Sequence, residues 1–261
     1  MTRRNPARRT VLGVVTLAAV ALGSGPALAQ GCGDLPSHAA LKDVLTTVVD
    51  GGGNGGLANE MWATVVNRNG AVCAVAFTGE DRGDQWPGSR VISAQKANTA
   101  NAFSLPSDAG FGGALSSGNL YGTVQPDGSL FGLQFSNPVD TGVAYKGPPA
   151  RYGQPNDPMV RGRIGGVNVF GGGLALYDED QNVVGGFGVS GDTSCTDHVV
   201  AWKVRDALAL DFVPGGVSAT GDDNLIIATP PTPNTFEHPD CGGGVADIIA
   251  ALPEDFPIGA P

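Results

Sequence analysis

Three histidines occur in the 261-residue chain, so few side chains are available as bases or metal ligands: His38, His198 and His238. None of them forms a close metal-binding pair such as H-E-x-x-H. His198 stands near the start of a strongly amphipathic segment, and a single histidine can ligate a haem iron. The alternative is an ordinary partly buried or surface histidine. No nucleophile triad, carboxylate pair or phosphate loop is evident, so we expect no catalytic residue.

Residues Gly186–Gly191 match the dinucleotide-binding pattern G-x-G-x-x-G but do not fit its context. That motif places its glycines in the turn that follows a strand. Here Gly186 and Gly188 stand two apart inside a predicted strand, so both lie on the same face of it. We expect a flat strand face against which a helix or a planar ligand packs.

Two further motifs fail at positions that their chemistry requires. Asp178–Asn182 resembles the front of a calcium loop, but Val183 and Val189 replace the glycine and glutamate that such a loop needs. This segment is therefore predicted to be a hairpin turn with solvated acids. Ser190 cannot form a G-x-S-x-G nucleophile turn, because Asp192 stands in place of the last glycine.

Residues 1–29 have the composition of an export signal peptide. Basic residues precede the apolar run Val11–Leu22, which would form a helix of about 18 Å, too short for the roughly 30 Å core of a bilayer. Ala27-Leu28-Ala29 is a cleavage site that places the mature start at Gln30. Arg8-Arg9 and the residues after it resemble a twin-arginine signal, and an ordinary secretory signal is the alternative. We expect a secreted or periplasmic protein that is not inserted in a membrane after cleavage.

The charge balance argues against nucleic acid and anionic lipid as partners. The formal net charge is −10 for the whole chain, and without the four arginines of the leader 11 basic residues face 25 acidic ones. Such an acidic surface lacks the basic patch that either partner needs.

Export makes the four cysteines interpretable, since disulfides form in oxidising compartments. No two of them are spaced C-x-x-C, so a thioredoxin-type motif and a haem-attachment motif are absent. The scattered spacing also disfavours a four-thiolate zinc site. Of the three pairings that remain open, we favour Cys32–Cys73 with Cys195–Cys241.

Hydrophobic periodicity and turn residues predict an α+β fold with an antiparallel sheet of about five strands and packed helices. Helices are expected at three ranges: 38–49, 89–105 and 194–210. Strands are expected at seven: 61–66, 72–77, 130–135, 164–170, 174–177, 183–189 and 225–228. Residues 137–163 are predicted to be a long loop, and residues 215–261 a Pro/Gly-rich tail. The domain itself is expected to span residues 30–214.

Three pieces of the chain together resemble the GlcG/HbpS-like haem-binding family: Ala71–Phe77, the helix segment Lys96–Phe103 with K-A-x-T-A, and Val183–Gly191 ending in G-V-S-G. Their order and approximate spacing agree with the family over residues 38–211. The chain departs from the family through an insertion at 137–163 and the tail at 215–261.

The resemblance implies a profilin- or PAS-like shape, a homo-oligomer, and haem or another small planar ligand as the cofactor. It also implies a role in haem or redox sensing or in iron handling, with a membrane sensor protein as a partner. Two alternatives stay open: a ligand-free structural or interaction module, and an enzyme acting on small organic acids.

Lys96, Thr99 and Phe103 share one side of the predicted helix and are the candidate haem-binding residues. Lys96 would pair with a propionate, Thr99 would donate a hydrogen bond or ligate weakly, and Phe103 would stack on the porphyrin. The alternative is that Thr99 and Phe103 are core residues and that Lys96 either acts as a cap or pairs with a neighbouring acid. The metal ligand is not determined by the pattern.

Overall fold

A computed structural model of the chain describes residues 1–2, 31–107 and 113–259. Its centre is an antiparallel sheet of four strands, β1 (Trp62–Asn67), β2 (Val72–Phe77), β3 (Gly173–Tyr177) and β4 (Val183–Ser190), in the order β2-β1-β4-β3. The expected signal peptide lies outside the described residues. No helix in the described part is long and apolar enough to cross a membrane.

Two hairpins build the sheet, and both turns follow from their sequence. In the first, Gly70 has φ +75°, which suits glycine, and the Asn67 side chain accepts hydrogen bonds from the N–H groups of Asn69 and Ala71. In the second, Asp178 accepts hydrogen bonds from the N–H groups of Asp180 and Asn182. The acidic segment is thus a hairpin turn, as predicted.

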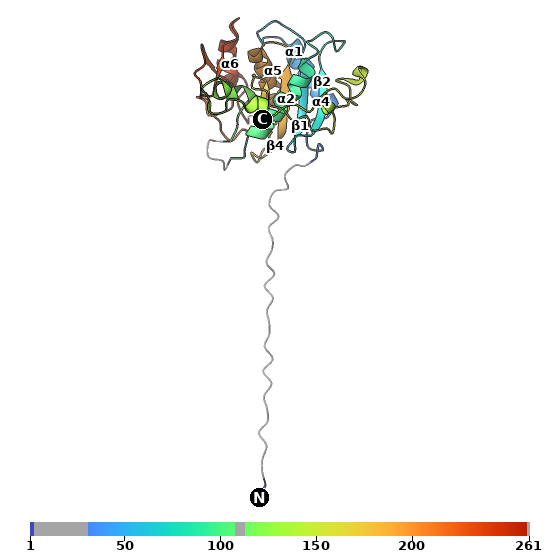
Figure 1. Cartoon of the computed structure of the whole chain (residues 1–261), viewed down its shortest axis with the longest axis vertical. Coiled ribbons are helices and arrows are strands. Elements are labelled where there is room, and N and C mark those ends of the chain that lie inside the picture. Colours follow the sequence, from blue (N-terminus) through green and yellow to red (C-terminus); the bar gives the residue numbers. More distant parts are fainter. Residues whose placement is uncertain (3–30, 108–112, 260–261) are drawn as a thin grey trace.

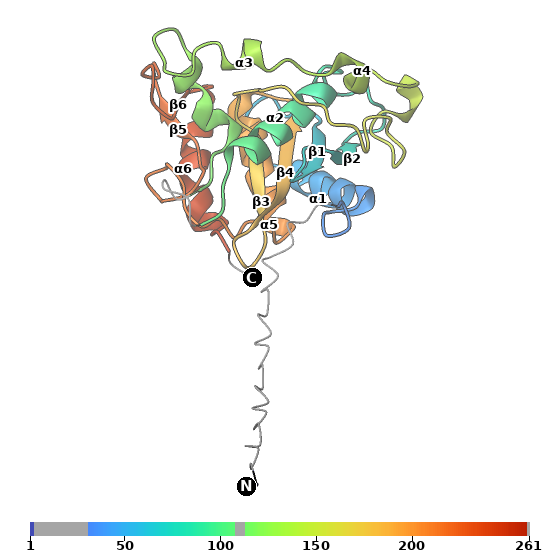
Figure 2. The ribbon, with the colours of Figure 1, turned by 60° about the horizontal axis from the view of Figure 1, so that its bottom comes forward.

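Helices cover both faces of the sheet (Figures 1 and 2). On one face α1 (His38–Asp50) and α5 (Ser194–Ala207) bury side chains such as Leu41 and Val199 against Val65 and Phe187. On the other face, α2 (Ser89–Phe103) packs Ala94 and Ala97 against Trp62 and Val66. The predicted helices and hairpins are therefore confirmed, although the main sheet has four strands and not about five.

Helix α2 approaches the sheet closely because Gly186 and Gly188 of β4 have no side chains. A Cβ atom at Gly186 would overlap the Ala97 carbonyl, and one at Gly188 would lie 2.6 Å from the Ala97 nitrogen. The strand face predicted from the two glycines is thus occupied by a helix of the same chain. Because the two glycines are two residues apart, both lie on the strand face that α2 covers, and this lets the helix approach the strand closely.

Two of the predicted strands do not form. In residues 130–135, Gly132 takes φ +93° and starts the short helix α3 (Leu133–Ser136), with Phe135 80% exposed. In residues 164–170, Gly165 and Gly166 both have positive φ, so the segment makes one isolated bridge, between Gly165 and Val139. Glycines in left-handed conformations interrupt the extended backbone that a strand requires.

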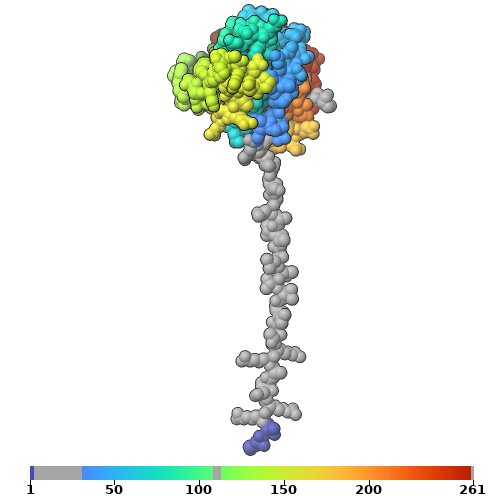
Figure 3. Space-filling view, turned by 90° about the vertical axis from the view of Figure 1, so that its right-hand side faces the viewer, coloured from blue at the N-terminus to red at the C-terminus, as the bar shows by residue number. Residues whose placement is uncertain are grey.

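The insertion at 137–163 is anchored on the α2 side of the sheet and contains α4 (Thr141–Ala144) and a 3₁₀ turn, Pro149–Arg151 (Figure 2). The buried Arg90 of α2 donates to the Asp157 carboxylate, with 2.9 Å from Nε to Oδ2, and its guanidinium stacks on Tyr152. His38 of α1 contacts the Gly153 carbonyl at 2.8 Å, and Figure 3 shows the insertion in yellow beside α1 in blue.

The C-terminal segment contains structure that the sequence did not predict. β5 (Ile226–Ala228) overlaps the expected strand 225–228 but pairs with β6 (Glu237–Pro239) in a separate parallel ladder. Helix α6 (Val245–Asp255) buries Val245, Ile249 and Leu252 in the same core as α5. Both disulfides, Cys32–Cys73 and Cys195–Cys241, are present as predicted.

Candidate functional site

Lys96 lies near the middle of α2, and its ammonium is buried between the sheet and α5. Its Nζ donates to Asp197 Oδ2 at 2.6 Å and to the Val189 carbonyl at 3.0 Å. The side chains of Lys96 and Asp197 are 1% and 3% exposed. Burial lowers the pKa of the Lys96 ammonium, and burial raises the pKa of Asp197 to about 6 although the adjacent Lys96 opposes that rise. Lys96 and Asp197 therefore form a buried ion pair.

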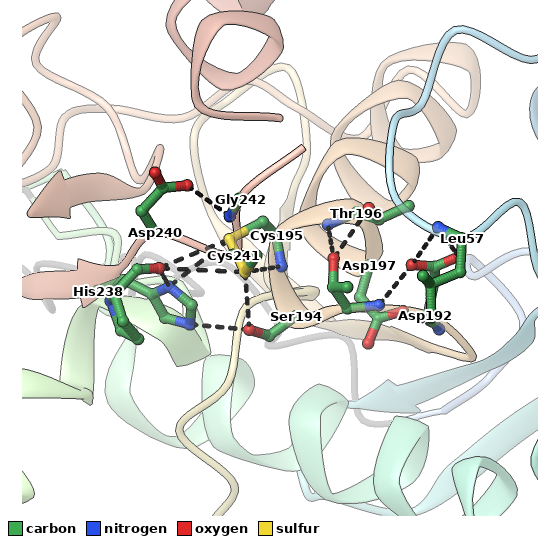
Figure 4. The surroundings of a disulfide bond; sticks show 12 residues. Leu57, Asp192, Ser194, Cys195, Thr196, Asp197, His238, Asp240, Cys241 and Gly242 are labelled. Atoms are coloured by element: carbon green, nitrogen blue, oxygen red, sulfur yellow. Dashed lines mark hydrogen bonds between the residues drawn. A yellow bond between two sulfur atoms is a disulfide. The ribbon is translucent and has the colours of Figure 1, made fainter. Parts of the chain in front are cut away.

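Asp197 also fixes the end of β4 to the first turn of α5. Its Oδ1 accepts the N–H groups of Gly191 at 3.0 Å and Asp192 at 2.9 Å. Asp192 in turn accepts the N–H group of Leu57 (Figure 4). It also accepts the N–H group of Asn59. The G-V-S-G-D segment is thus the junction at which the sheet, α2 and α5 meet.

Thr99 and Phe103 point into the interior of the protein. Thr99 is fully buried, donates to the Gln95 carbonyl at 2.7 Å and accepts from the Asn168 N–H at 2.9 Å. Phe103 is half-buried against an apolar cluster that includes Leu115 and Val169. Segments of the chain itself occupy the surroundings in which a porphyrin was expected to meet these two residues.

A pocket of about 280 Å³ opens beside Lys96, between the first half of α2 and the start of α5. Of the three candidate binding residues, Lys96 borders this pocket, whereas Thr99 and Phe103 do not. Trp86 and Phe170, which are 52% and 46% exposed, also border it. The rest of the lining is mainly polar: Ser89, Ile92, Ser190, Asp192, Ser194 and Asp197.

The pocket combines a cation at its base, several hydroxyl groups and two exposed aromatic rings. Exposed aromatic side chains beside a cavity can stack on a planar molecule, and an ammonium suits a carboxylate. The two exposed rings suit a planar molecule, whereas Lys96 is already paired with Asp197 and Asp192 adds a second carboxylate to the lining. Trp86, Phe170, Ser194 and Asp197 were not predicted from the sequence, since no local pattern relates them to Lys96.

His198 does not border the pocket. It is fully buried in α5, its Nε2 lies 3.2 Å from Asn224 Oδ1, and burial lowers its pKa to about 3. A ligand in the pocket would not reach this ring, so the structure gives no support for His198 as the iron ligand.

Among the described residues, one group of three side chains comes close enough to hold a metal ion: Cys195, His238 and Cys241, with ligand atoms within 4.8 Å of one another. The two sulfur atoms form a disulfide with each other (Figure 4). They are therefore not available as thiolate ligands in this state.

Comparison with known proteins establishes the family. The family model described as "haem degrading protein HbpS-like" matches residues 43–206, which is more than half of the chain. The chain therefore belongs to the HbpS-like family, as the sequence motifs predicted. No curated protein matches the chain.

Three solved structures are similar to the chain at low identity. They are Klebsiella pneumoniae protein ORFY (22% identity, TM-score 0.43, covering 67% of this chain and 90% of that one), a PduOC:haem complex (20%, 0.43, 65% and 89%) and a double mutant of Streptomyces reticuli HbpS (18%, 0.42, 74% and 99%).

Proposed function

We propose that this protein is an exported haem-binding protein with a role in haem or redox sensing or in iron handling. The observation that supports this function best is the pocket beside Lys96, with Trp86 and Phe170 exposed at its border. Membership in the HbpS-like family, whose model is described as haem-degrading, favours haem over other planar molecules.

The residues around the pocket fit one edge of a haem. Lys96 uses two of its three N–H donors, on Val189 and Asp197, which leaves one for a propionate. A volume of about 280 Å³ is close to the lower end of ligand pockets, roughly 300 Å³, so the propionate edge would enter while the macrocycle lies against Trp86 and Phe170. Bound haem would supply iron redox chemistry.

The pocket offers the iron only oxygen ligands. Its lining contains hydroxyl groups and the carboxylates of Asp192 and Asp197. None of the described residues that line it is a histidine, a cysteine or a methionine. We infer that haem is held mainly by its edge and its face, so that binding is reversible. This arrangement suits a protein that senses or passes on haem.

Export and assembly complete the proposal. The two disulfides support an oxidising compartment, secreted or periplasmic. A homo-oligomer is proposed from the family resemblance, and a second copy placed over the exposed rings would cover the outer part of the macrocycle. The membrane sensor partner stays a prediction.

Titration of the purified protein with haemin tests this function. We expect a shifted Soret band that saturates near one haemin per chain, together with quenching of tryptophan fluorescence. Trp86→Ala and Lys96→Met should each weaken binding about tenfold or more, by loss of a stacking contact and of a charge-assisted hydrogen bond respectively. Phe135→Ala, which removes an exposed ring outside the lining of the pocket, is the matched control. Unchanged spectra at micromolar haemin would refute the proposal.

A further inference from the structure

Ser194 and His238 form a hydrogen-bonded pair at the start of α5. The distance between Ser194 Oγ and His238 Nε2 is 3.2 Å, and His238 Nδ1 lies 2.8 Å from the Pro239 carbonyl oxygen (Figure 4). Because a carbonyl oxygen only accepts, Nδ1 carries the ring proton and Nε2 presents its lone pair. The Ser194 hydroxyl therefore donates to Nε2, which is a better acceptor than Cys241 Sγ at 3.5 Å.

The fold holds both partners in place. Cys195, next to Ser194 in α5, is linked by a disulfide to Cys241, three residues beyond His238. His238 lies in β6, is fully buried, and has the Tyr121 ring 5.4 Å from its own. The Pro239 carbonyl therefore orients the imidazole at Nδ1, and Nε2 points toward Ser194 Oγ.

Ser194 borders the pocket beside Lys96 and is partly exposed. His238 does not line the pocket. A serine that borders a ligand cavity and whose hydroxyl donates to an oriented neutral imidazole is the arrangement of an activated nucleophile. We propose that Ser194 is a nucleophile, with His238 as its general base, and that the pocket hydrolyses small esters with a planar apolar group. This activity does not rest on haem binding.

The reaction balances with water as the only co-reactant. Ser194 Oγ bonds to the ester carbonyl carbon while its proton passes to His238 Nε2. The bond from that carbon to the leaving oxygen then breaks, and Nε2 returns the proton to this oxygen, which gives an alcohol and an acyl-serine. Water attacks the acyl carbon, gives a proton to Nε2, and releases a carboxylic acid as the proton returns to Ser194.

Other groups around the pocket suit this chemistry. The Lys96 ammonium borders the same pocket and is the cation available to the oxyanion, while Trp86 and Phe170 are available to a planar group of the ester. Burial lowers the pKa of His238 to about 4, so its Nε2 is unprotonated at pH 6 to 8 and is a weaker base than an exposed imidazole.

The test measures covalent labelling and turnover by the purified full-length protein. A sulfonyl fluoride should add once per chain, at Ser194 by peptide mapping, and 4-nitrophenyl acetate should be hydrolysed. Ser194→Ala should abolish both reactions, and His238→Gln should slow labelling at least a hundredfold, the range of general-base contributions. Ser136→Ala, which removes an exposed serine of α3, should leave both unchanged.

The pH dependence keeps the proposal testable if His238→Gln fails to fold. With His238 as the base, the labelling rate of the unmodified protein should be nearly constant between pH 6 and pH 8. A rate that rises tenfold per pH unit would indicate direct reaction through hydroxide and would overturn the proposal. Absence of labelling, or equal labelling of Ser194→Ala, would also overturn it. Haemin titration of Ser194→Ala shows separately whether haem binding stands.

Discussion

The ammonium of Lys96 lies 2.6 Å from the carboxylate of Asp197, although the helices that carry them cover opposite faces of the sheet. Lys96 reaches Asp197 beside β4, where it also donates to the Val189 carbonyl. A Cβ atom at Gly188 would lie 3.1 Å from Lys96 Cβ, so the glycine leaves room for the lysine stem. One buried ion pair thus joins both helical layers at the border of the pocket.

Replacing Lys96 by methionine should lower the free energy of unfolding by about 3–5 kcal/mol, because it leaves the buried Asp197 carboxylate without its cation. Chemical denaturation of the ligand-free protein measures this loss. Lys146→Met, at an exposed lysine, is the matched control and should have little effect. Asp197→Asn should lower the free energy of unfolding less in the Lys96→Met background than in the unmodified protein. Equal decreases in the two backgrounds would show that Lys96 and Asp197 do not interact energetically.

Gly188→Ala should destabilise the protein by about 1–3 kcal/mol or more, because the new methyl group would overlap the Ser93 carbonyl and lie 2.6 Å from the Ala97 nitrogen. Backbone atoms of α2 would have to move away from the sheet. Gly33→Ala, where a Cβ atom meets nothing within 4 Å, should be nearly neutral. Equal melting temperatures for the two variants would contradict the close packing of α2 on β4.

Acid should destabilise the protein through His198. Burial lowers the folded-state pKa of this ring to about 3 against an ordinary value of 6.5, so between these values the unfolded chain binds a proton that the folded chain does not. The stabilisation is present above pH 6.5 and is lost as the pH falls. Between pH 7 and pH 5 the loss is about 2 kcal/mol.

His238, with its pKa lowered to about 4, acts in the same direction as His198. Asp197, with its pKa raised to about 6, acts in the opposite direction, because the folded chain binds a proton there first as the pH falls. The contribution of His198 is isolated by urea denaturation of His198→Gln at both pH values. Its loss of stability between pH 7 and pH 5 should be about 2 kcal/mol smaller than that of the unmodified protein, and an identical loss would contradict the prediction.

Removing either disulfide should cost about 4 kcal/mol, since the linked cysteines are 41 and 46 residues apart and each bond restricts a long loop of the unfolded chain. Paired cysteine-to-serine variants, compared by denaturant midpoint, measure the cost. The variant without Cys195–Cys241 should in addition lose sulfonyl fluoride labelling, because this bond holds Ser194 near His238. The variant without Cys32–Cys73 should retain labelling once folded, and loss of labelling in both would indicate a general effect on the fold.

The amino-acid sequence was sufficient for the elements whose side chains repeat with a clear period. Helices α1, α2 and α5 and the hairpin of β1 and β2 were predicted because their apolar residues recur on one face and their turns contain Asn-Gly or similar residues. The family motifs and the cysteine pairing were also predicted from the sequence. Helix α6 was missed because its apolar period follows three glycines and ends near Pro253, within a segment rich in turn residues.

Tertiary structure alone decided what the candidate side chains contact. Lys96 and Asp197 are 101 residues apart, and Ser194 and His238 are 44 residues apart, so no local pattern relates either pair. The shared helix face of Lys96, Thr99 and Phe103 was evident from spacing, yet which of them reaches a pocket depends on segments far away in the sequence. Local periodicity determines which face of a helix is apolar, whereas the path of the rest of the chain determines what covers that face.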